Sequence, residues 1–366
     1  MASAPVLYNL LEPPRYGWER DGQLYKPTAR ELWSELFYRV NVFRDRKNWL
    51  PFTNWFWTVC LVPFAVVFLW KYHSLPIAAL GVVYSMVWLG THGTVWLHRY
   101  GTHRAFTFRN EVYKFICRNL SIKIVPDEIY IVSHRVHHEL SEKPGDPYNV
   151  YAGGLYCFLA DTNHQPINRN MTEQEYFTAT RLMAHTGIRM NSYAQYQKWG
   201  SIAHPLTTSL HFALNWAFWY GTFWLIGGHA LATGIFAWSL MWAVGIRTFN
   251  FAGHGSGKDR RRPGIDFNDD NIAINQLWPG FVAGEWHSNH HLYPNGVRAG
   301  FLPWQFDLAY VFIRFYKLIG GVATWRDYKR QFYDRYYLPW LRANGRPLPA
   351  SEERASASAS ASVEPT

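Results

Sequence analysis

Four apolar segments alternate with long polar blocks along the chain. They cover residues 54–70, 75–97, 205–226 and 230–248. The last two are separated only by Gly227, Gly228 and His229. A helix needs roughly 17–25 apolar residues to cross a bilayer. The pattern therefore predicts four membrane-spanning helices, in two closely spaced pairs.

The polar sequence around the spans completes an all-α prediction, with a cytoplasmic helical cap on four transmembrane helices. Residues 1–52 are expected to form a cytoplasmic segment, in which a capping box over residues 28–31 opens an amphipathic helix. That helix would lie in the membrane interface or, alternatively, pack as a surface helix on a protein core. Residues 53–330 would form the membrane domain. Residues 331–366 would follow as a C-terminal segment with a disordered tail rich in Ala and Ser.

Basic residues predict the orientation of the spans. Of 36 Lys and Arg, residues 1–52 hold 8, residues 98–203 hold 12 and residues 249–366 hold 14. The positive-inside rule places these three blocks, and therefore both termini, in the cytoplasm. A net charge of +10 then faces membrane lipids or an acidic partner. No nucleic-acid-binding motif accompanies the charge, and no nucleic-acid partner is expected.

Histidines give the strongest chemical signal, because the spacing H-x-x-H-H occurs twice and further histidines follow the second and fourth spans. The nine residues of this set are His98, His103, His134, His137, His138, His254, His287, His290 and His291. Residues i, i+3 and i+4 of a helix point to one side, so each triplet is expected to aim three imidazoles at one spot. Imidazole is the commonest metal ligand in proteins. The set predicts a metal site beside the cytoplasmic face of the membrane.

Nine imidazoles exceed the four to six ligands that one zinc, copper or iron ion takes, so two ions are predicted. A closed structural zinc site would usually include cysteine, but the three cysteines, at positions 60, 117 and 157, are far apart. A redox pair of irons that activates O₂ fits this ligand set better. Glu285, Asp146 and Asn289 are candidates to orient imidazoles by accepting their second N–H. Ordinary helix caps or surface ion pairs are the alternative for these three residues.

The order and spacing of the histidine boxes resemble the membrane-bound fatty acid desaturases over roughly residues 50–330. The segments 98–106 and 286–291 are similar to the acyl Δ9 group, which includes stearoyl-CoA desaturase. Further matching residues are Pro294, Arg298, Gly300, Trp304, Phe306 and Asp307. Residues 146–149 are similar to that group's D-P-H-N, which adds Asn149 to the residues expected beside the metals. Asn250 and His254 match its N-x-x-x-H, where the Asn holds a metal through water.

This resemblance implies a centre of two iron ions (Fe²⁺/Fe³⁺) that uses O₂ as co-substrate. The enzyme would remove two hydrogens from a long saturated acyl chain and leave a cis double bond, at Δ9 in that group. The acyl chain would arrive as an acyl-CoA, an acyl-lipid or an acyl carrier protein thioester. The chain has neither the H-P-G-G motif of a fused cytochrome b5 nor a cysteine set for an iron–sulfur cluster. An external donor is therefore expected, either ferredoxin or cytochrome b5 with its reductase. The lack of a fused donor favours a bacterial inner membrane, with the endoplasmic reticulum as the eukaryotic counterpart.

The sequence departs from the family pattern at three places that bear on the substrate. The family's Trp upstream of the second box is replaced in Ile129-Tyr130, and the third box reads G-E-W-H rather than G-E-G-W-H. Residues 139–200 have no clear counterpart. A hydroxylase, ketolase or acetylenase on the same scaffold is therefore an alternative. A metal transporter or metal sensor is a remote alternative, because it would place facing His or Asp pairs within the spans. The spans hold only His92 and His211, which we expect to be structural. Arg99, Arg104 and Arg135 are expected either to bind lipid or CoA phosphates or to brace the helices.

Overall fold

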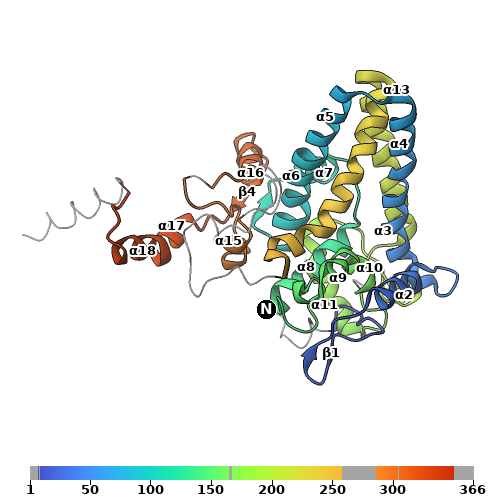
Figure 1. Cartoon of the computed structure of the whole chain (residues 1–366), viewed down its shortest axis with the longest axis horizontal. Coiled ribbons are helices and arrows are strands. Elements are labelled where there is room, and N and C mark those ends of the chain that lie inside the picture. Colours follow the sequence, from blue (N-terminus) through green and yellow to red (C-terminus); the bar gives the residue numbers. More distant parts are fainter. Residues whose placement is uncertain (1–6, 8, 165–166, 258–285, 304, 350–366) are drawn as a thin grey trace, which may run out of the picture.

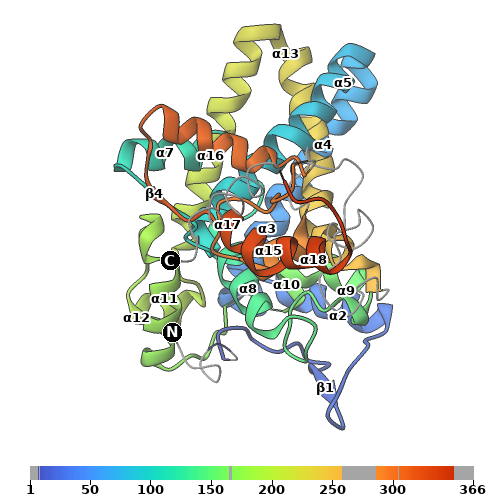
Figure 2. The same cartoon turned by 90° about the vertical axis from the view of Figure 1, so that its left-hand side faces the viewer.

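The computed structural model describes residues 7, 9–164, 167–257, 286–303 and 305–349, and it is mostly helical (Figure 1). Long helices rise together as a bundle at one end, and shorter helices gather around their lower ends. The C-terminal helices lie to one side of this layer in Figure 1 and face the viewer in Figure 2. Glu285, Trp304 and the tail from residue 350 lie outside the described residues, so the expectations for them stay predictions.

Three helical stretches among the described residues are long and apolar enough to cross a membrane: Arg46–Tyr72, Leu75–Thr102 and Pro205–Gly253. The first comprises η1 (Arg46–Asn48), α3 (Trp49–Val59), α4 (Leu61–Val67) and η2 (Phe68–Tyr72). The second comprises α5 (Leu75–Val83), η3 (Tyr84–Leu89), α6 (Gly90–Gly93) and η4 (Thr94–Thr102). Both are longer than the predicted apolar segments, because the helical backbone continues through polar residues at their ends.

The third stretch, α13 (Pro205–Gly253), is one element of 49 residues with a break in its middle. Gly227 and Gly228 leave the helical conformation there, and Gly228 has a φ of 67° that favours glycine. Beyond the break the chain doubles back, since the rings of Trp216 and Phe236 lie 5.3 Å apart. A straight helix of this length would measure about 74 Å, more than twice the hydrocarbon thickness of a bilayer. α13 therefore consists of two packed arms, which match the predicted segments 205–226 and 230–248.

Two glycines allow α5 to pack closely against the second arm of α13. A Cβ at Gly81 would lie 2.4 Å from the indole Cδ1 of Trp238, and one at Gly234 would lie 2.3 Å from Cγ2 of Ile77. Small residues let helix backbones approach closely where the surrounding medium is as apolar as the side chains. These two positions fix the spacing between the second and third helical stretches.

The layer around the lower ends of the spans contains the following elements: β1 (Glu19–Arg20), β2 (Gln23–Leu24), α2 (Ala29–Val40), α7 (Glu111–Asn119), α8 (Asp127–Leu140), η5 (Val150–Ala152), α9 (Gly154–Phe158), α10 (Ala160–Asn163), α11 (Glu173–Met183), η6 (Ala184–Thr186), α12 (Tyr193–Trp199) and η7 (Gly255–Gly257). The capping box predicted for α2 is confirmed, because Thr28 and Glu31 bond reciprocally. Leu32 and Leu36 are buried against the layer, whereas Phe37 is 66% exposed. α2 therefore packs on a protein core and presents aromatic side chains outward.

The C-terminal part contains α15 (His287–Leu292), α16 (Leu308–Leu318), β4 (Val322–Trp325), α17 (Lys329–Phe332), η8 (Tyr333–Tyr337) and α18 (Leu338–Ala343). Strand β4 pairs antiparallel with β3 (Phe106–Phe108), which follows the first histidine box. Together with the hairpin of β1 and β2, this pairing corrects the all-α prediction. Strands of two to four residues are too short to show an alternating pattern in the sequence.

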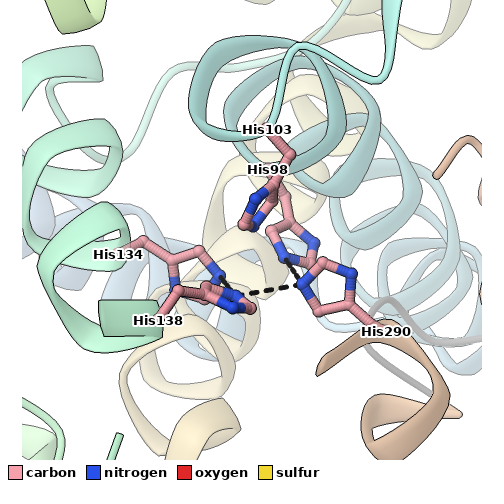
Figure 3. A group of neighbouring side chains, drawn as sticks. All are labelled: His98, His103, His134, His138 and His290. Carbon is pink, nitrogen blue, oxygen red and sulfur yellow. Dashed lines mark hydrogen bonds between the residues drawn. The ribbon is translucent and has the colours of Figure 1, made fainter. Parts of the chain in front are cut away.

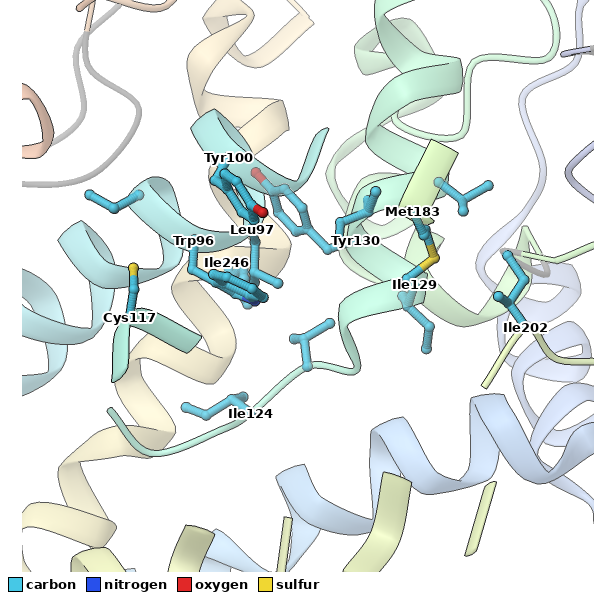
Figure 4. Packing of buried hydrophobic residues seen from close by; sticks show 14 of the residues in the cluster. Trp96, Leu97, Tyr100, Cys117, Ile124, Ile129, Tyr130, Met183, Ile202 and Ile246 are labelled. Carbon is cyan, nitrogen blue, oxygen red and sulfur yellow. The ribbon is translucent and has the colours of Figure 1, made fainter. Parts of the chain in front are cut away.

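A buried apolar core lies between the end of the second span, α8 and the second arm of α13 (Figure 4). Trp96, Ile129 and Ile246 contribute from these three elements. Tyr100 lies at the top of this group, within the first histidine box between His98 and His103. The core therefore holds the three histidine-bearing segments at fixed distances from one another.

Candidate metal centre

All nine histidines selected from the sequence come together, and they do so in two groups. His98, His103, His134, His138 and His290 form one group of possible metal ligands, and His137, His254, His287 and His291 form the other. Within each group the ligand atoms all lie within 4.8 Å of one another. Figure 3 shows the five rings of the first group pointing toward a common point from three segments of the chain. The site residues thus come from both ends of the described chain.

The first box is shaped by a π-helix. On an α-helix, residues five apart would lie about 140° apart around the axis. In η4 the N–H of His103 instead bonds to the carbonyl of His98 at 3.1 Å, which is the i→i+5 pattern of a π-helix. The wider turn brings the two rings together, with centroids 4.9 Å apart. The H-x-x-x-x-H spacing therefore places both imidazoles in one group because the helix is locally unwound.

The two H-x-x-H-H boxes lie on α8 and α15, and each is divided between the two groups. His134 and His138 face the first group and His137 the second, while His287 and His291 face the second and His290 the first. This corrects the expectation that a triplet aims at one spot. Residues i and i+4 are about 40° apart around the helix, whereas i+3 and i+4 are about 100° apart. Each helix therefore contributes ligands to both groups.

The spacing of the ring nitrogens suits metal coordination. Nε2 of His290 lies 2.9 Å from Nε2 of His98 and 3.1 Å from Nε2 of His138. In the second group, Nε2 of His254 lies 3.1 Å from those of both His137 and His287. Two nitrogens bound at right angles, each about 2.1 Å from one ion, would be about 3.0 Å apart. Each Nε2 has either one proton or one lone pair, so one such nitrogen cannot make an ordinary hydrogen bond to each of two others. Coordination to a common metal ion accounts for these contacts better.

Buried polar atoms without partners support the same interpretation. Neither ring nitrogen of His103 has a hydrogen-bond partner among the described residues, although the residue is 2% exposed. Leaving a buried polar group unpaired costs about 1–3 kcal/mol. Coordination of an ion by one nitrogen of His103 would remove part of that cost. The donor set therefore fits two metal ions, with five imidazoles around one and four around the other.

Burial keeps these imidazoles in the form that binds metal. Burial, together with the neighbouring imidazoles, holds the pKa of His103, His134 and His290 well below the usual value. Burial also lowers the pKa of His254. A lowered pKa leaves the ring neutral at pH 7, with a lone pair free for coordination.

Two carboxylates orient ligands of the second group. The Nδ1–H of His137 donates to Oδ1 of Asp146 at 2.8 Å, as proposed from the sequence, and Asp146 is fully buried. The Nδ1–H of His254 donates to Oε1 of Glu142 at 3.1 Å. Glu142 was missed, because its contact with His254 spans 112 positions. The run of acidic residues after the second box, which includes Glu139, was the available signal.

The asparagines proposed near the site have different surroundings. Asn250 is buried one helical turn before His254, and its Oδ1 has no partner among the described residues, which leaves it able to bind water. Asn149 donates to the carbonyl of Lys143 and caps η5, so it shapes the loop that carries Asp146. Asn289 donates to the carbonyl of Ala299 and to Gln305, and so braces α15. These bonds favour a role for Asn289 in positioning α15 over the predicted role as an acceptor for an imidazole N–H.

Backbone strain is concentrated at the site. Among the described residues, five that are not glycine have a positive φ. Four of them adjoin the histidines or their partners: Arg104, Glu142, Ser256 and Trp286. A positive φ costs such residues energy and persists only where the surroundings impose it, often at functional sites.

The arginines next to the grouped histidines make contacts within the protein, and Arg104 donates to the carbonyls of Arg181 and Leu182. Arg99 is buried, pairs with Asp307 at 2.9 Å and also donates to the carbonyl of Val297, so it braces the fold. Arg135 pairs with Glu139 at 3.4 Å near the surface. His92 lies away from both groups, where it contacts Ser121 and the carbonyl of Cys117, which agrees with the structural role expected for it.

Fold and site together define a class of helical proteins, which have helices long enough to cross a membrane and clustered imidazoles that could hold metal ions. Residues 73–311 match the family model described as "Fatty acid desaturase". The chain belongs to the fatty acid desaturase family, and the predictions of a desaturase-type enzyme and of a membrane-spanning, histidine-rich chain are confirmed at that level.

Curated relatives have low identity and several activities. A hex-5-enoyl-[acyl-carrier protein] acetylenase of Moorena producens (strain JHB) is 27% identical over 266 residues, which is 68% of this chain and 77% of the relative. The Delta-9 acyl-lipid desaturase 2 of Arabidopsis thaliana is 24% identical over 66% of this chain and 73% of its own. A probable acyl-CoA desaturase of Schizosaccharomyces pombe is 22% identical over 75% of this chain, but only 55% of its own length is covered.

Proposed function

We propose that the protein desaturates a long saturated fatty acyl chain at a pair of histidine-bound irons, using O₂. The observation that carries this proposal is the assembly of nine imidazoles into two groups, of five and four ligands. Family membership supplies the reaction class. In the balanced reaction, the acyl chain loses two hydrogens and becomes an alkene. O₂ receives those two hydrogens, two further electrons from a donor and two protons, and leaves as two waters.

The protein's own residues would hold and orient this centre. The first group would bind one iron and the second group the other, with Asn250 holding a water on the second, one turn from His254. Asp146 and Glu142 would keep the protons of His137 and His254 on Nδ1, so that Nε2 faces the ion. When bound, the irons would supply the O₂-derived oxidant that breaks the two C–H bonds.

Two small cavities, lined by both apolar and charged side chains, mark the region beneath the metals where we propose that the acyl chain lies. One, of about 20 Å³, is lined by Tyr130 and Asn250. The other, of about 40 Å³, lies between the second span and the second arm of α13, beside Trp96. Both cavities are lined by Val125 and Ile246. An acyl chain following this line would pass the metal groups and end between the spans. The methylene pair held near the irons would then determine where along the acyl chain the double bond forms.

Tyr130 is well placed to influence where along the acyl chain the double bond forms. Its ring stacks on His134 at 5.1 Å, and it lines the cavity that contains Asn250. It belongs to the pair Ile129-Tyr130 that stands where the resemblance to the Δ9 group led us to expect a Trp. We therefore propose a cis product with Δ9 as the first position to test, on a CoA-, lipid- or carrier-protein-bound chain.

We propose that four segments cross the membrane, namely the first two helical stretches and the two arms of α13. Both termini and the metal centre would then face the cytoplasm. The doubled-back α13 supports an even number of crossings. The distribution of Lys and Arg supports the orientation. A bacterial inner membrane is the proposed location, or the endoplasmic reticulum in a eukaryote. Ferredoxin, or cytochrome b5 with its reductase, would be the electron donor, because a basic surface favours an acidic partner.

An acetylenase is the second candidate, favoured by the relative from Moorena producens. It would perform the same hydrogen removal on a chain that already has a double bond. The two functions differ in the substrate accepted beside Tyr130 rather than in the metal ligands. Hydroxylation and ketone formation on the same scaffold remain alternatives that the product would identify.

Expression of the full chain in a desaturase-deficient cell, followed by mass spectrometry with double-bond localisation, tests the proposal. A new monounsaturated fatty acid should appear. His290→Ala should abolish it. His229→Ala, which removes an exposed histidine bonded only to Tyr220, should not. A triple bond would favour the acetylenase, and hydroxylated chains in place of alkenes would contradict the desaturase.

A further inference from the structure

A cavity of about 320 Å³ lies away from the metal groups, where α8 and the first arm of α13 begin. Its walls come from the end of α7, the first turn of α8, residues 187–189 and the first turns of α13. None of the nine grouped histidines lines it. The mechanism proposed for the metal centre therefore does not use this cavity.

The mouth of the cavity adjoins an exposed apolar surface. Phe115 lines the cavity from α7 and is 68% exposed, and Leu206 and Leu210 are exposed on the adjoining turns of α13. Because α13 is long and apolar enough to cross a membrane, hydrocarbon chains would lie against these side chains. An amphiphile could place its polar end in the cavity and its tail along α13.

Two helices begin at this cavity without a side-chain cap. Pro126 precedes α8, and His204 precedes α13, and neither accepts a capping hydrogen bond through its side chain. The first backbone N–H groups of a helix then seek other acceptors, and the positive end of the helix dipole favours an anion. Arg189 lines the cavity and has no carboxylate within ion-pair distance among the described residues.

Glu128 supplies an independent indication of a ligand. It lines the cavity and is 2% exposed. Its Oε2 accepts from the N–H groups of Ile202 and Ala203, at 2.6 and 3.1 Å, while Oε1 has no partner among the described residues. Burial raises the pKa of Glu128 to about 8. The carboxyl is therefore mostly protonated at neutral pH, and Oε1 is the oxygen free to carry that proton and donate it to a bound acceptor.

The other carboxylate that lines the cavity is already neutralised. Asp127 lines the same cavity, but Arg118 donates to it at 2.8 and 3.0 Å. Trp96 donates to its other oxygen at 2.9 Å, and the ammonium of Lys123 lies 3.8 Å away. With Arg189 added, the groups around the cavity have a net positive charge.

We propose that this cavity binds a phosphate group, and that the group belongs to the head of a membrane lipid. Arg189 and the two helix N-termini would hold the phosphate oxygens, and the Glu128 carboxyl would donate to one of them. The apolar mouth favours a lipid over free phosphate as the source. This inference does not depend on desaturation, because it rests on residues that the metal centre does not use.

Lipid binding to the purified, delipidated full chain in detergent tests the proposal by native mass spectrometry. The probes are dioleoylphosphatidylglycerol, dioleoylglycerol, which lacks the phosphate, and inorganic phosphate. The phosphatidylglycerol should bind, and Arg189→Ala should weaken it about tenfold, the effect of one charge-assisted hydrogen bond. Arg181→Ala, at an exposed arginine outside the cavity, is the matched control and should leave binding unchanged.

Variants of Glu128 test its role as a donor. Glu128→Gln keeps an N–H at this position and should bind within about twofold of the original chain, whereas Glu128→Met should lose about tenfold. Equal binding of dioleoylglycerol, or no difference between the two arginine variants, would overturn the proposal. Loss of binding in Glu128→Gln would overturn the donor role. Inorganic phosphate binding as tightly as the lipid would overturn the lipid as the source.

Discussion

The guanidinium of Arg99 donates a hydrogen bond of 2.9 Å to Oδ2 of Asp307, and the two residues are 208 positions apart. Arg99 follows the ligand His98 on the second span. Asp307 caps α16 and also accepts from the N–H of Ala299, in the segment that follows α15. This buried pair therefore fixes the segment that carries the third histidine box against the end of the span.

Asp307→Asn is expected to destabilise the protein by about 3–5 kcal/mol, because it leaves the buried guanidinium of Arg99 without a counter-charge. The variant should also lose metal, since His290 would no longer be held opposite His98. Thermal unfolding in detergent and metal analysis measure the two effects. Asp334→Asn, in the exposed pair with Arg330, should change stability by less than about 1 kcal/mol. Equal effects of the two variants would contradict the bracing role.

Asp146→Asn should lower metal affinity about 10- to 100-fold, because the bond to Nδ1 of His137 fixes the orientation and the tautomer of that ligand. Glu142→Gln should act in the same direction through His254. Competition with a chelator of known affinity measures both. Glu139 lies in the same part of the chain, and its carboxylate pairs with Arg135 near the surface. The Glu139→Gln variant should therefore keep full metal affinity. A Glu142 variant with unchanged affinity would show that its bond to His254 is incidental.

Gly234→Ala should destabilise the helix bundle, because the added Cβ would lie 2.3 Å from Ile77. Overpacking of this kind typically costs about 1–3 kcal/mol. Gly221→Ala, on the other arm of α13, meets no atom within 4 Å and should be neutral or slightly stabilising. Melting temperatures of the two variants in the same detergent give the comparison, and an equal response would mean that α5 and α13 are not packed this closely.

The metal-free protein should lose stability as the pH falls below about 6.5. Burial lowers the pKa of His103, His134 and His290 in the folded state, whereas in the unfolded chain they titrate near 6.5. Below that pH the unfolded state binds more protons, so each such histidine contributes up to about 1.4 kcal/mol per pH unit. Denaturant unfolding of chelator-treated protein between pH 7.5 and 5.5 measures the slope. A stability that is flat or rises over this range would contradict the burial of neutral imidazoles.

The gathering of these histidines could be predicted from the sequence because helical periodicity is local. Spacings of three and four residues within 134–138 and 287–291 place imidazoles on one side of a helix whatever the rest of the fold does. The apolar segments could also be predicted from the sequence. The break at Gly227 and Gly228 corresponds to the short gap between the third and fourth of them. The membrane class and the metal chemistry follow from these short-range patterns.

The division of the ligands between two ions could not be predicted, because it depends on how α8 and α15 face each other. The pairing of β3 with β4 could not be predicted either, because it joins residues far apart in the sequence, such as Thr107 and Thr324. The π-turn that unites His98 and His103 depends on packing around the span end rather than on a residue signal. The bond between Glu142 and His254 likewise requires two segments that meet only in the folded chain.

Metal stoichiometry tests the central claim most directly. The full chain, purified from iron-supplemented cells, should contain two iron ions per chain by elemental analysis. His290→Ala should lower the iron content of the first group alone, and His287→Ala that of the second, so that each variant retains about one ion per chain. His229→Ala, the control at an exposed site, should retain both ions. A single ion in the unaltered protein, or the loss of both ions from either variant with the fold intact by circular dichroism, would contradict two separate histidine sites.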